Sequence, residues 1–371
     1  MNLRKHFLYD HGIYLLSHSV GLPPADTLVV WQSQFLKPWQ GATEDNWPAW
    51  LSVIDGFRGA VADLLGGQPD DICPQVNLSS ALTKIVGSLP VAKERTGVLC
   101  SEEDFPSMGF VLQQACAQGQ TLRYLSADQD LQDLQVWHDM LSADIGMALI
   151  THVQSNTGRQ LPVAEITRLC RERGIISVVD VAQSAGVLPI DLNEWHADFL
   201  IGSCVKWLCG GPGAGFLWVS PDKVNQCQPQ DVGWFSHEAP FEFDIRHFRY
   251  APDAMRFWGG TPSIQPYVIA TNSLNTLSRI GIQTIREHNL ALTDQLLRGV
   301  ADEHCMSPRE PALRGGTVVL RYPEARLHSI ADVMRETGIA FDLRHTGMRL
   351  SPHIYNDGEE IAELAACLID A

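Results

Sequence analysis

Short apolar runs alternate with amphipathic segments in the middle of the chain, and this alternation constrains the fold more than any other feature of the sequence. The apolar runs occupy residues 146–153, 175–180, 197–203 and 213–220. Between the first two, "PVAEITRLCRERG" (162–174) begins with proline, carries apolar residues at helical spacing and ends in glycine, as helices do. Apolar strands separated by helices are typical of a mainly parallel sheet that is buried on both faces. The sequence therefore predicts an α/β domain.

A smaller α+β domain is expected after this sheet. Residues 274–300 have the pattern of a long amphipathic helix or a helix pair. "GGTVVLRY" (315–322) predicts a strand, and the later "SIADVMRETG" and "GMRLSP" predict a helix and a second strand. The predicted division is a large domain with an N-terminal segment over residues 1–254 and a small C-terminal domain over residues 255–371.

Composition and charge argue against several classes of function. A formal net charge of −16 disfavours nonspecific binding to nucleic acid or to an anionic membrane. No apolar run approaches the ~18 residues that span a membrane, and the N-terminus lacks the pattern of a signal peptide. The nine cysteines are scattered without a C-x-x-C pair, which predicts reduced thiols in the cytoplasm and no zinc site.

One lysine, Lys206, lies inside the apolar stretch "GSCVKWLCGGPGAGFLWV" (202–219). A lysine in a dry pocket has a lowered pKa and a usable neutral amine, so it can form a Schiff base or carry a proton. The alternative is a lysine whose stem packs on apolar neighbours while its ammonium reaches water. Asp180 is the last residue of the apolar run 175–180, and Ser203 is the last residue of the run 197–203. Ligands of mainly parallel sheets bind beyond the carboxyl ends of the strands.

An acid and a lysine at neighbouring strand ends suit pyridoxal phosphate. The cofactor needs a lysine for its aldehyde and a carboxylate to keep its pyridine nitrogen protonated, which makes the ring an electron sink. The alternative for Asp180 is a helix N-cap before "VAQSAG". These residues alone leave both interpretations open.

The stretch "VVDVAQSAGVLPIDLNEWHADFLIGSCVKWLCGGPGAGFLWV" resembles the cofactor-binding core of the class V, fold-type I pyridoxal-phosphate enzymes. Six further motifs resemble those of kynureninases and occur in family order across almost the whole chain: "IYLLSHSVGLPP", "SSALTKIV", "DFPSMG", "VGWFSHE", "GGTPSI" and "MRLSPHIYN". The resemblance implies a fold-type I transferase fold, with a mainly parallel seven-stranded sheet in the large domain and a smaller C-terminal α+β domain.

The resemblance also implies roles for residues around the cofactor ring. Lys206 would form the internal aldimine and shuttle the α-proton of the substrate, and Asp180 would pair with the pyridine nitrogen. Gln183 would contact the ring, and Phe105 would stack on it. For Phe105 the alternative is an ordinary core aromatic residue.

A second group of residues would bind the phosphate. "SALT", which includes Leu82 and Thr83, would offer backbone N–H groups and a hydroxyl at a helix start; the alternative is an ordinary helix cap. Ser203 matches a phosphate-binding serine of class V relatives. Trp234 and Thr261 match residues that complete the phosphate site of kynureninases, partly from the neighbouring subunit, which implies a homodimer. For Thr261 a structural role in a turn is equally open.

Arg349, in "MRLSP", matches the arginine that clamps the α-carboxylate of an amino-acid substrate. A guanidinium suits this task because its planar fork binds a carboxylate with two hydrogen bonds. The alternative is a surface arginine on a strand of the small domain.

Three positions depart from the kynureninase pattern. Gln183 stands where kynureninases have histidine, Val205 where they have the tyrosine that precedes the lysine, and Met108 where they usually have aspartate. These changes leave the cofactor pocket intact and weaken the expectation of kynurenine cleavage.

Kynureninase-like cleavage at the β-carbon of an amino acid is the first functional hypothesis. The alternative is a class V aminotransferase or a C–S lyase, which would use the same Lys206, Asp180 and Arg349. A cysteine desulfurase is disfavoured because "FDLRHTGMRLSP" lacks the mobile cysteine expected before the arginine motif. A non-catalytic protein on this fold is disfavoured by the retained lysine.

Overall fold

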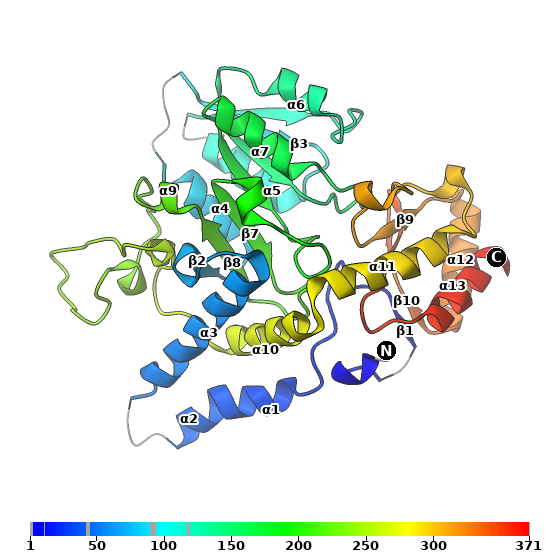
Figure 1. Ribbon diagram of the computed structural model, residues 1–371, viewed down its shortest axis with the longest axis horizontal. Helices are drawn as coiled ribbons and strands as arrows, with labels where there is room; N and C mark the ends of the chain where they lie inside the picture. The colour runs from blue at the N-terminus through cyan, green and yellow to red at the C-terminus, as the bar shows by residue number, and fades with distance from the viewer. Residues whose placement is uncertain (1–2, 11, 42–44, 90–93, 117–118, 371) are drawn as a thin grey trace.

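The computed structural model describes residues 3–10, 12–41, 45–89, 94–116 and 119–370. Figure 1 shows a central sheet covered by helices and, at the right, a smaller group of helices and short strands beside which both ends of the chain lie. Among the described residues, no helix combines the length and the apolar composition needed to cross a membrane.

The central sheet has seven strands in the order β2-β8-β7-β6-β5-β3-β4. Its strands are β2 (Ile72–Gln75), β3 (Gly97–Ser101), β4 (Thr121–Leu125), β5 (Ile145–Thr151), β6 (Ile176–Asp180), β7 (Phe199–Ser203) and β8 (Gly215–Val219). β8 is antiparallel to both of its neighbours, whereas the pairs from β7 to β4 are parallel. The predicted α/β fold with a mainly parallel seven-stranded sheet is confirmed, and the four predicted apolar runs form β5 to β8.

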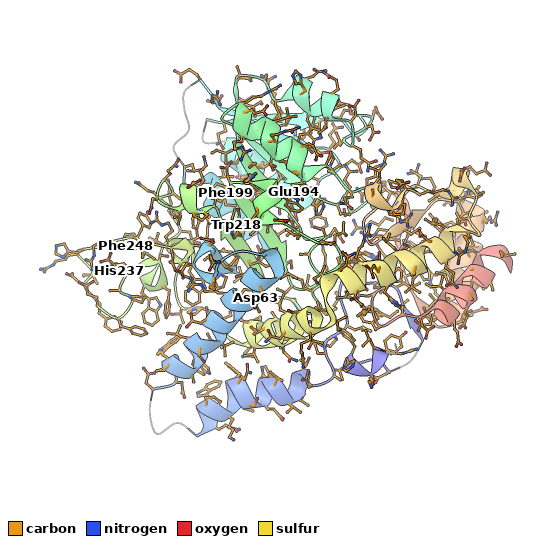
Figure 2. The ribbon with its side chains drawn as sticks, viewed as in Figure 1. Asp63, Glu194, Phe199, Trp218, His237 and Phe248 are labelled. Carbon is orange, nitrogen blue, oxygen red and sulfur yellow. The ribbon has the colours of Figure 1, made fainter. Side chains whose placement is uncertain are left out.

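Helices cover both faces of this sheet because its strands are apolar on both sides. The helices of this part are α1 (Thr27–Trp31), α2 (Lys37–Gln40), α3 (Trp47–Leu65), α4 (Leu78–Val86), α5 (Pro106–Cys116), α6 (Leu134–Met140), α7 (Val163–Glu172), α8 (Leu192–Trp195) and α9 (Pro221–Val224). Phe199 on β7 and Trp218 on β8 are both buried, and Figure 2 shows them in the middle of the sheet. Helix α7 forms where proline, helical spacing and glycine predict it.

The smaller part is built on a three-stranded antiparallel sheet with the order β11-β12-β9. Its strands are β9 (Val318–Leu320), β11 (Asp342–Arg344) and β12 (Gly347–Leu350), and its helices are α11 (Ile282–Leu297), α12 (Glu324–Glu336) and α13 (Gly358–Asp370). Helix α10 (Gln265–Ile280) precedes α11, and the two are separated by Gly281 with φ +91°, a conformation that favours glycine. The predicted helix pair is therefore present.

Two elements link the predicted domains. β1 (Ile13–Tyr14) pairs in parallel with β10 (Ile339–Ala340), so the N-terminal segment joins the core of the smaller part. Helix α10 packs against α3 and contributes apolar side chains to the core of the large part. The division into residues 1–254 and 255–371 remains a proposal, and these two elements cross it.

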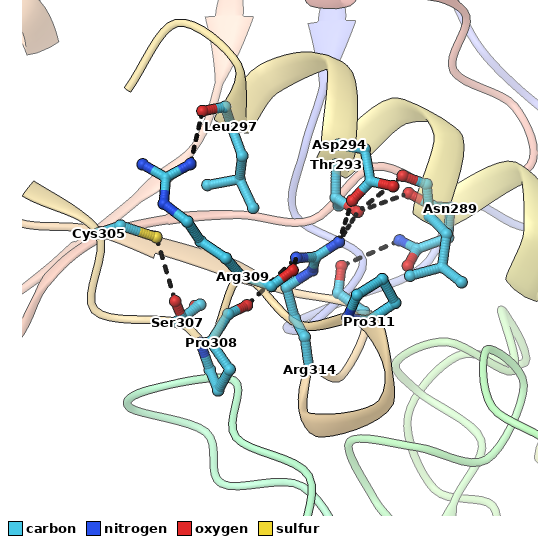
Figure 3. Close-up of polar contacts among 12 residues, drawn as sticks. Asn289, Thr293, Asp294, Leu297, Cys305, Ser307, Pro308, Arg309, Pro311 and Arg314 are labelled. Atoms are coloured by element: carbon cyan, nitrogen blue, oxygen red, sulfur yellow. Dashed lines mark hydrogen bonds and ion pairs between the residues drawn. The ribbon is translucent and has the colours of Figure 1, made fainter. Parts of the chain in front are cut away.

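A buried arginine anchors the loop that leads into β9. The Arg314 guanidinium is fully buried and donates to the carbonyls of Pro308, at 3.1 Å, and Arg309, at 2.6 Å. Its other terminal nitrogen contacts Thr293 and Asp294 on α11 (Figure 3). Buried charges are tolerated when they are paired and hydrogen-bonded in this way. The network fixes β9 against α11, and β9 in turn pairs with β12, which carries Arg349.

Candidate active site

Lys206 and Asp180 meet at one edge of the central sheet. β6 ends at Asp180 and the parallel neighbour β7 ends at Ser203, three residues before Lys206. Burial lowers the pKa of Lys206 from 10.5 to about 8; the negative charge of Asp180 opposes this shift, and the positive charges of Arg349 and Arg344 add to it. A substantial fraction of the amine is therefore neutral near physiological pH, which a snorkelling lysine in water would not allow.

Asp180 is buried beside this amine. Burial raises its pKa, whereas the hydrogen bond from the Ala182 N–H and the charge of Lys206 lower it. The Ala182 N–H donates to Oδ1 at 2.7 Å. The described residues between β6 and α8 form turns and no helix, so the N-cap interpretation is wrong. The Asp180 carboxylate instead holds the turn that follows β6, and its charge acts on Lys206.

Phe105 lies near the amine and has an open face. Its ring centroid is 5.6 Å from the Nζ atom of Lys206, and its side chain is 41% exposed. The preceding Asp104 fixes the turn: it accepts hydrogen bonds from the Thr151 hydroxyl at 2.6 Å and from the Ser101 N–H at 2.8 Å. Burial raises the pKa of Asp104 to about 7. The sequence analysis did not single out Asp104, and its position in "DFPSMG" was the only available signal.

The amide of Gln183 is engaged within the protein. Its Nε2 donates to the carbonyl of His18 at 3.1 Å, and its Oε1 accepts from the indole N–H of Trp207 at 3.1 Å. These bonds hold the N-terminal segment and the segment of Lys206 against the turn that follows Asp180. The predicted contact of Gln183 with a cofactor ring stays a prediction, as does the phosphate contact of the half-buried Ser203.

The helix start expected at "SALT" lies earlier in the chain. α4 begins at Leu78, and the side chain of its N-cap Asn77 accepts from the Ser80 N–H at 2.9 Å. Leu82 is buried in the core, and the Thr83 hydroxyl donates to a helix carbonyl. The helix N–H groups that an anion can reach belong to the first turn. The helix start is therefore corrected to Leu78, because Asn77 supplies the capping side chain; the phosphate roles of Leu82 and Thr83 stay predictions.

Trp234 and Thr261 lie on two segments that pack together. The Phe235 N–H donates to the carbonyl of Gly259 at 3.1 Å, which ties the segment of Trp234 to "GGTPS". The Trp234 ring is part of an aromatic cluster, 5.5 Å from Trp47 between ring centroids. Thr261 is exposed. The structure brings these two segments together, and their place at a phosphate site across a subunit boundary stays a prediction.

Arg349 is buried, with only 2% of its surface exposed, so it is not a surface arginine. Its Nε donates to the Asp342 carboxylate at 2.7 Å, its Nη2 contacts the same carboxylate, and its Nη1 donates to the Ser155 carbonyl at 3.2 Å. Asp342 also lies 3.6 Å from the Nε2 atom of the buried His18. The sequence analysis missed Asp342 and His18, although both belong to segments that it examined.

These residues fit pyridoxal phosphate. A partly neutral lysine, a buried carboxylate beside it and an aromatic ring with an open face are the groups that the aldehyde, the pyridine nitrogen and the ring plane require. The first turn of α4 follows β2 of the same sheet and offers N–H groups to an anion.

Comparisons with known proteins agree with this assembly. The family model described as aminotransferase class-V matches residues 49–364. A kynureninase of Deinococcus radiodurans is 31% identical over 351 residues, covering 90% of this chain and 82% of the relative. An uncharacterized aminotransferase of Bacillus subtilis, YcbU, is 27% identical over 326 residues, covering 86% of this chain and 85% of the relative.

Solved structures with the same fold include PLP-dependent enzymes. A cysteine desulfurase of Thermococcus onnurineus superposes with a TM-score of 0.86 at 21% identity, covering 97% of this chain and 94% of the other. The cystine C–S lyase C-DES superposes with a TM-score of 0.88 at 22% identity, covering 97% and 98%. A second C-DES structure contains the PLP cofactor. The cofactor of the present protein is pyridoxal 5′-phosphate, and the chain belongs to the class V aminotransferase family of PLP-dependent enzymes.

Proposed function

We propose that this enzyme cleaves an α-amino acid at its β-carbon, as kynureninases do. The observation that carries the proposal is a partly neutral lysine, Lys206, whose pKa responds to the charges of two buried residues, the carboxylate of Asp180 and the guanidinium of Arg349. The similarity to kynureninases over most of the chain supports the choice of reaction.

Each of the three residues has a separate task. The bound cofactor supplies an electron sink for the carbanion chemistry. The Nζ atom of Lys206 would hold the aldehyde of the cofactor and would accept the α-proton of a bound substrate, because its lowered pKa permits proton transfer near neutral pH. Asp180 would keep the pyridine nitrogen protonated, and Arg349 would orient the substrate by its α-carboxylate.

A C–S lyase or aminotransferase reaction is the second candidate. Val205 has no group that can donate or accept a proton, so it does not replace the tyrosine of kynureninases. Met108 is buried in a hydrophobic cluster and does not replace their aspartate. The buried thiols of Cys204 and Cys209 have raised pKa values because of burial. Such thiols are poor nucleophiles, which argues against a desulfurase and leaves lyase and aminotransferase chemistry open.

Product analysis tests the proposal. The purified enzyme is incubated with kynurenine, 3-hydroxykynurenine, cysteine conjugates and common amino donors, with and without a keto acid. We expect alanine or pyruvate to be released without a keto acid, and the Lys206→Ala variant to release neither. Lys223→Ala is the matched control, because Lys223 lies on helix α9 and is paired with Asp198 at 3.3 Å. Turnover that depends strictly on a keto acid would identify an aminotransferase and contradict the proposal.

We also propose a homodimer with composite active sites. The segment after Trp234 projects from the large part at the left of Figure 2, where His237 and Phe248 are labelled. Its side chains include Phe243, 71% exposed, and Ile245, 99% exposed. Exposed apolar groups of this kind favour burial against another surface, and a two-fold dimer is the commonest arrangement. The free cysteines of the described chain support a reducing compartment, and we propose the cytoplasm.

A further inference from the structure

Four nitrogen atoms from three side chains lie around one carboxylate oxygen beside the proposed substrate site. Asp342 and Arg349 are direct cross-strand partners in the β11–β12 pair. The Oδ2 atom of Asp342 accepts from the Nε of Arg349 and contacts its Nη2. The Nε of Arg344 lies 3.4 Å from the same oxygen, and the Nε2 of His18 lies 3.6 Å from it. Asp342 is thus the shared counter-ion of two arginines.

The contacts of Arg349 leave hydrogen-bond donors free for one carboxylate. A guanidinium has five N–H donors. The Nε donor points to Asp342, and Nη2 and Nη1 contact Asp342 and the Ser155 carbonyl. At least one N–H on each terminal nitrogen has no partner in these contacts, and two such donors form an end-on fork for a single carboxylate.

Arg344 is the second arginine of this cluster and is more accessible. It lies two residues from Asp342 on β11, so both side chains are on the same face of the strand. Its side chain is 34% exposed and that of Asp342 is 30% exposed. The positive charges of both arginines act on Lys206 and lower its pKa, which places Arg344 within electrostatic reach of the reacting amine. Arg344 could therefore hold a second carboxylate if Asp342 did not neutralise it.

We propose that Asp342 determines substrate specificity by excluding amino acids whose side chain carries a second carboxylate. This inference rests on the proposed function, because it assumes that Arg349 binds the α-carboxylate. The Asp342 carboxylate pairs with the Arg344 guanidinium and repels a carboxylate on the substrate side chain. It also holds Arg349, and one N–H on each terminal nitrogen of Arg349 stays free to bind the α-carboxylate. The buried His18 ring lies beside this carboxylate without a hydrogen bond to it: its Nδ1 is 2.6 Å from the Ser351 hydroxyl, and its Nε2 is 3.6 Å from the Asp342 oxygen. The substrate class is therefore an amino acid with one carboxylate and a side chain that is not anionic.

Competition between matched acids tests the specificity. The holoenzyme is titrated with L-alanine, whose binding is followed by the absorbance of the bound cofactor, in the presence of butanoate or succinate. These two acids have the same chain length and differ in the second carboxylate. The inhibition constants are compared for the wild type, Asp342→Asn, Asp342→Ser and Asp342→Asn/Arg344→Gln.

We expect the ratio of the succinate constant to the butanoate constant to fall about 10-fold in both single variants, which corresponds to about 1.4 kcal/mol. The ratio should return toward the wild-type value in the double variant, because Arg344 would be the receiving group. An unchanged ratio in Asp342→Asn and Asp342→Ser would overturn the inference, and so would a fall in the ratio that persists in the double variant. In either case L-alanine binding would still support the proposed function. If no amino acid alters the cofactor absorbance of the wild type, the proposed function and this inference both fail.

Discussion

The pH at which the apoprotein captures its cofactor should report the pKa of Lys206. Burial lowers this pKa from 10.5 to about 8. At pH 7 about one amine in ten is then neutral, against about one in 3,000 for an ordinary lysine, so the reactive form is about 300-fold enriched. Because only the neutral amine attacks the aldehyde, capture should accelerate about tenfold per pH unit below pH 8 and level off above it.

Stopped-flow absorbance with limiting pyridoxal phosphate measures this rate between about pH 6 and pH 10. Two variants test the electrostatic contributions to the pKa of Lys206. The negative charge of Asp180 raises the pKa of Lys206, so Asp180→Asn should move the midpoint to lower pH. The positive charge of Arg344 lowers this pKa, so Arg344→Gln should move it to higher pH. A wild-type rate that still rises up to the highest pH measured, as expected for an ordinary lysine, or midpoint shifts of the same sign in both variants, would refute the electrostatic reasoning.

Three further predictions concern substrate binding, stability and assembly. Arg349→Lys should retain the cofactor spectrum and lower kcat/KM for any accepted amino acid by about 30-fold or more. The reason is that lysine keeps the positive charge but loses the two-pronged geometry of the guanidinium. Steady-state kinetics that match the wild type would contradict a role of Arg349 in binding the α-carboxylate. Lys84→Met should lower the free energy of unfolding by about 1–3 kcal/mol, because the buried Lys84 donates to the carbonyls of Phe257 and Trp258 at 2.8 and 2.7 Å. Urea titration checks this, and the control is Arg335→Met, which removes an exposed ion pair with Asp332 and should cost less than about 1 kcal/mol. Light scattering should give the mass of a dimer, and an active, cofactor-loaded monomer would rule out composite sites.

Patterns that depend on local spacing predicted the architecture well. The alternation of apolar runs and amphipathic helices identified β5, β6, β7 and β8, because strands buried on both faces must be apolar throughout. Asp180 and Lys206 could be predicted as neighbours because the carboxyl ends of parallel strands meet at one edge. The β1–β10 pairing could not, since it joins Ile13 to Ile339 and two-residue strands leave no periodic signal.

Long-range side-chain contacts account for what the sequence did not reveal in the site. The pair between Asp342 and Arg349 depends on the register of a short hairpin. Its approach to His18 depends on the pairing of the N-terminal segment with Ser351, which follows β12. The helix start expected at "SALT" was misplaced because serine, threonine and asparagine can all cap a helix, and here Asn77 takes that position.

The central claim is that Lys206 is the residue that binds the cofactor, and borohydride reduction followed by peptide mass mapping tests it most directly. Reduction of the holoenzyme fixes the cofactor to the lysine that carries it. The account predicts one pyridoxyl-modified peptide, containing Lys206, and its loss in Lys206→Ala. A pyridoxyl group on a different lysine of the wild type, or a reduced holoenzyme without any modified lysine, would contradict the account.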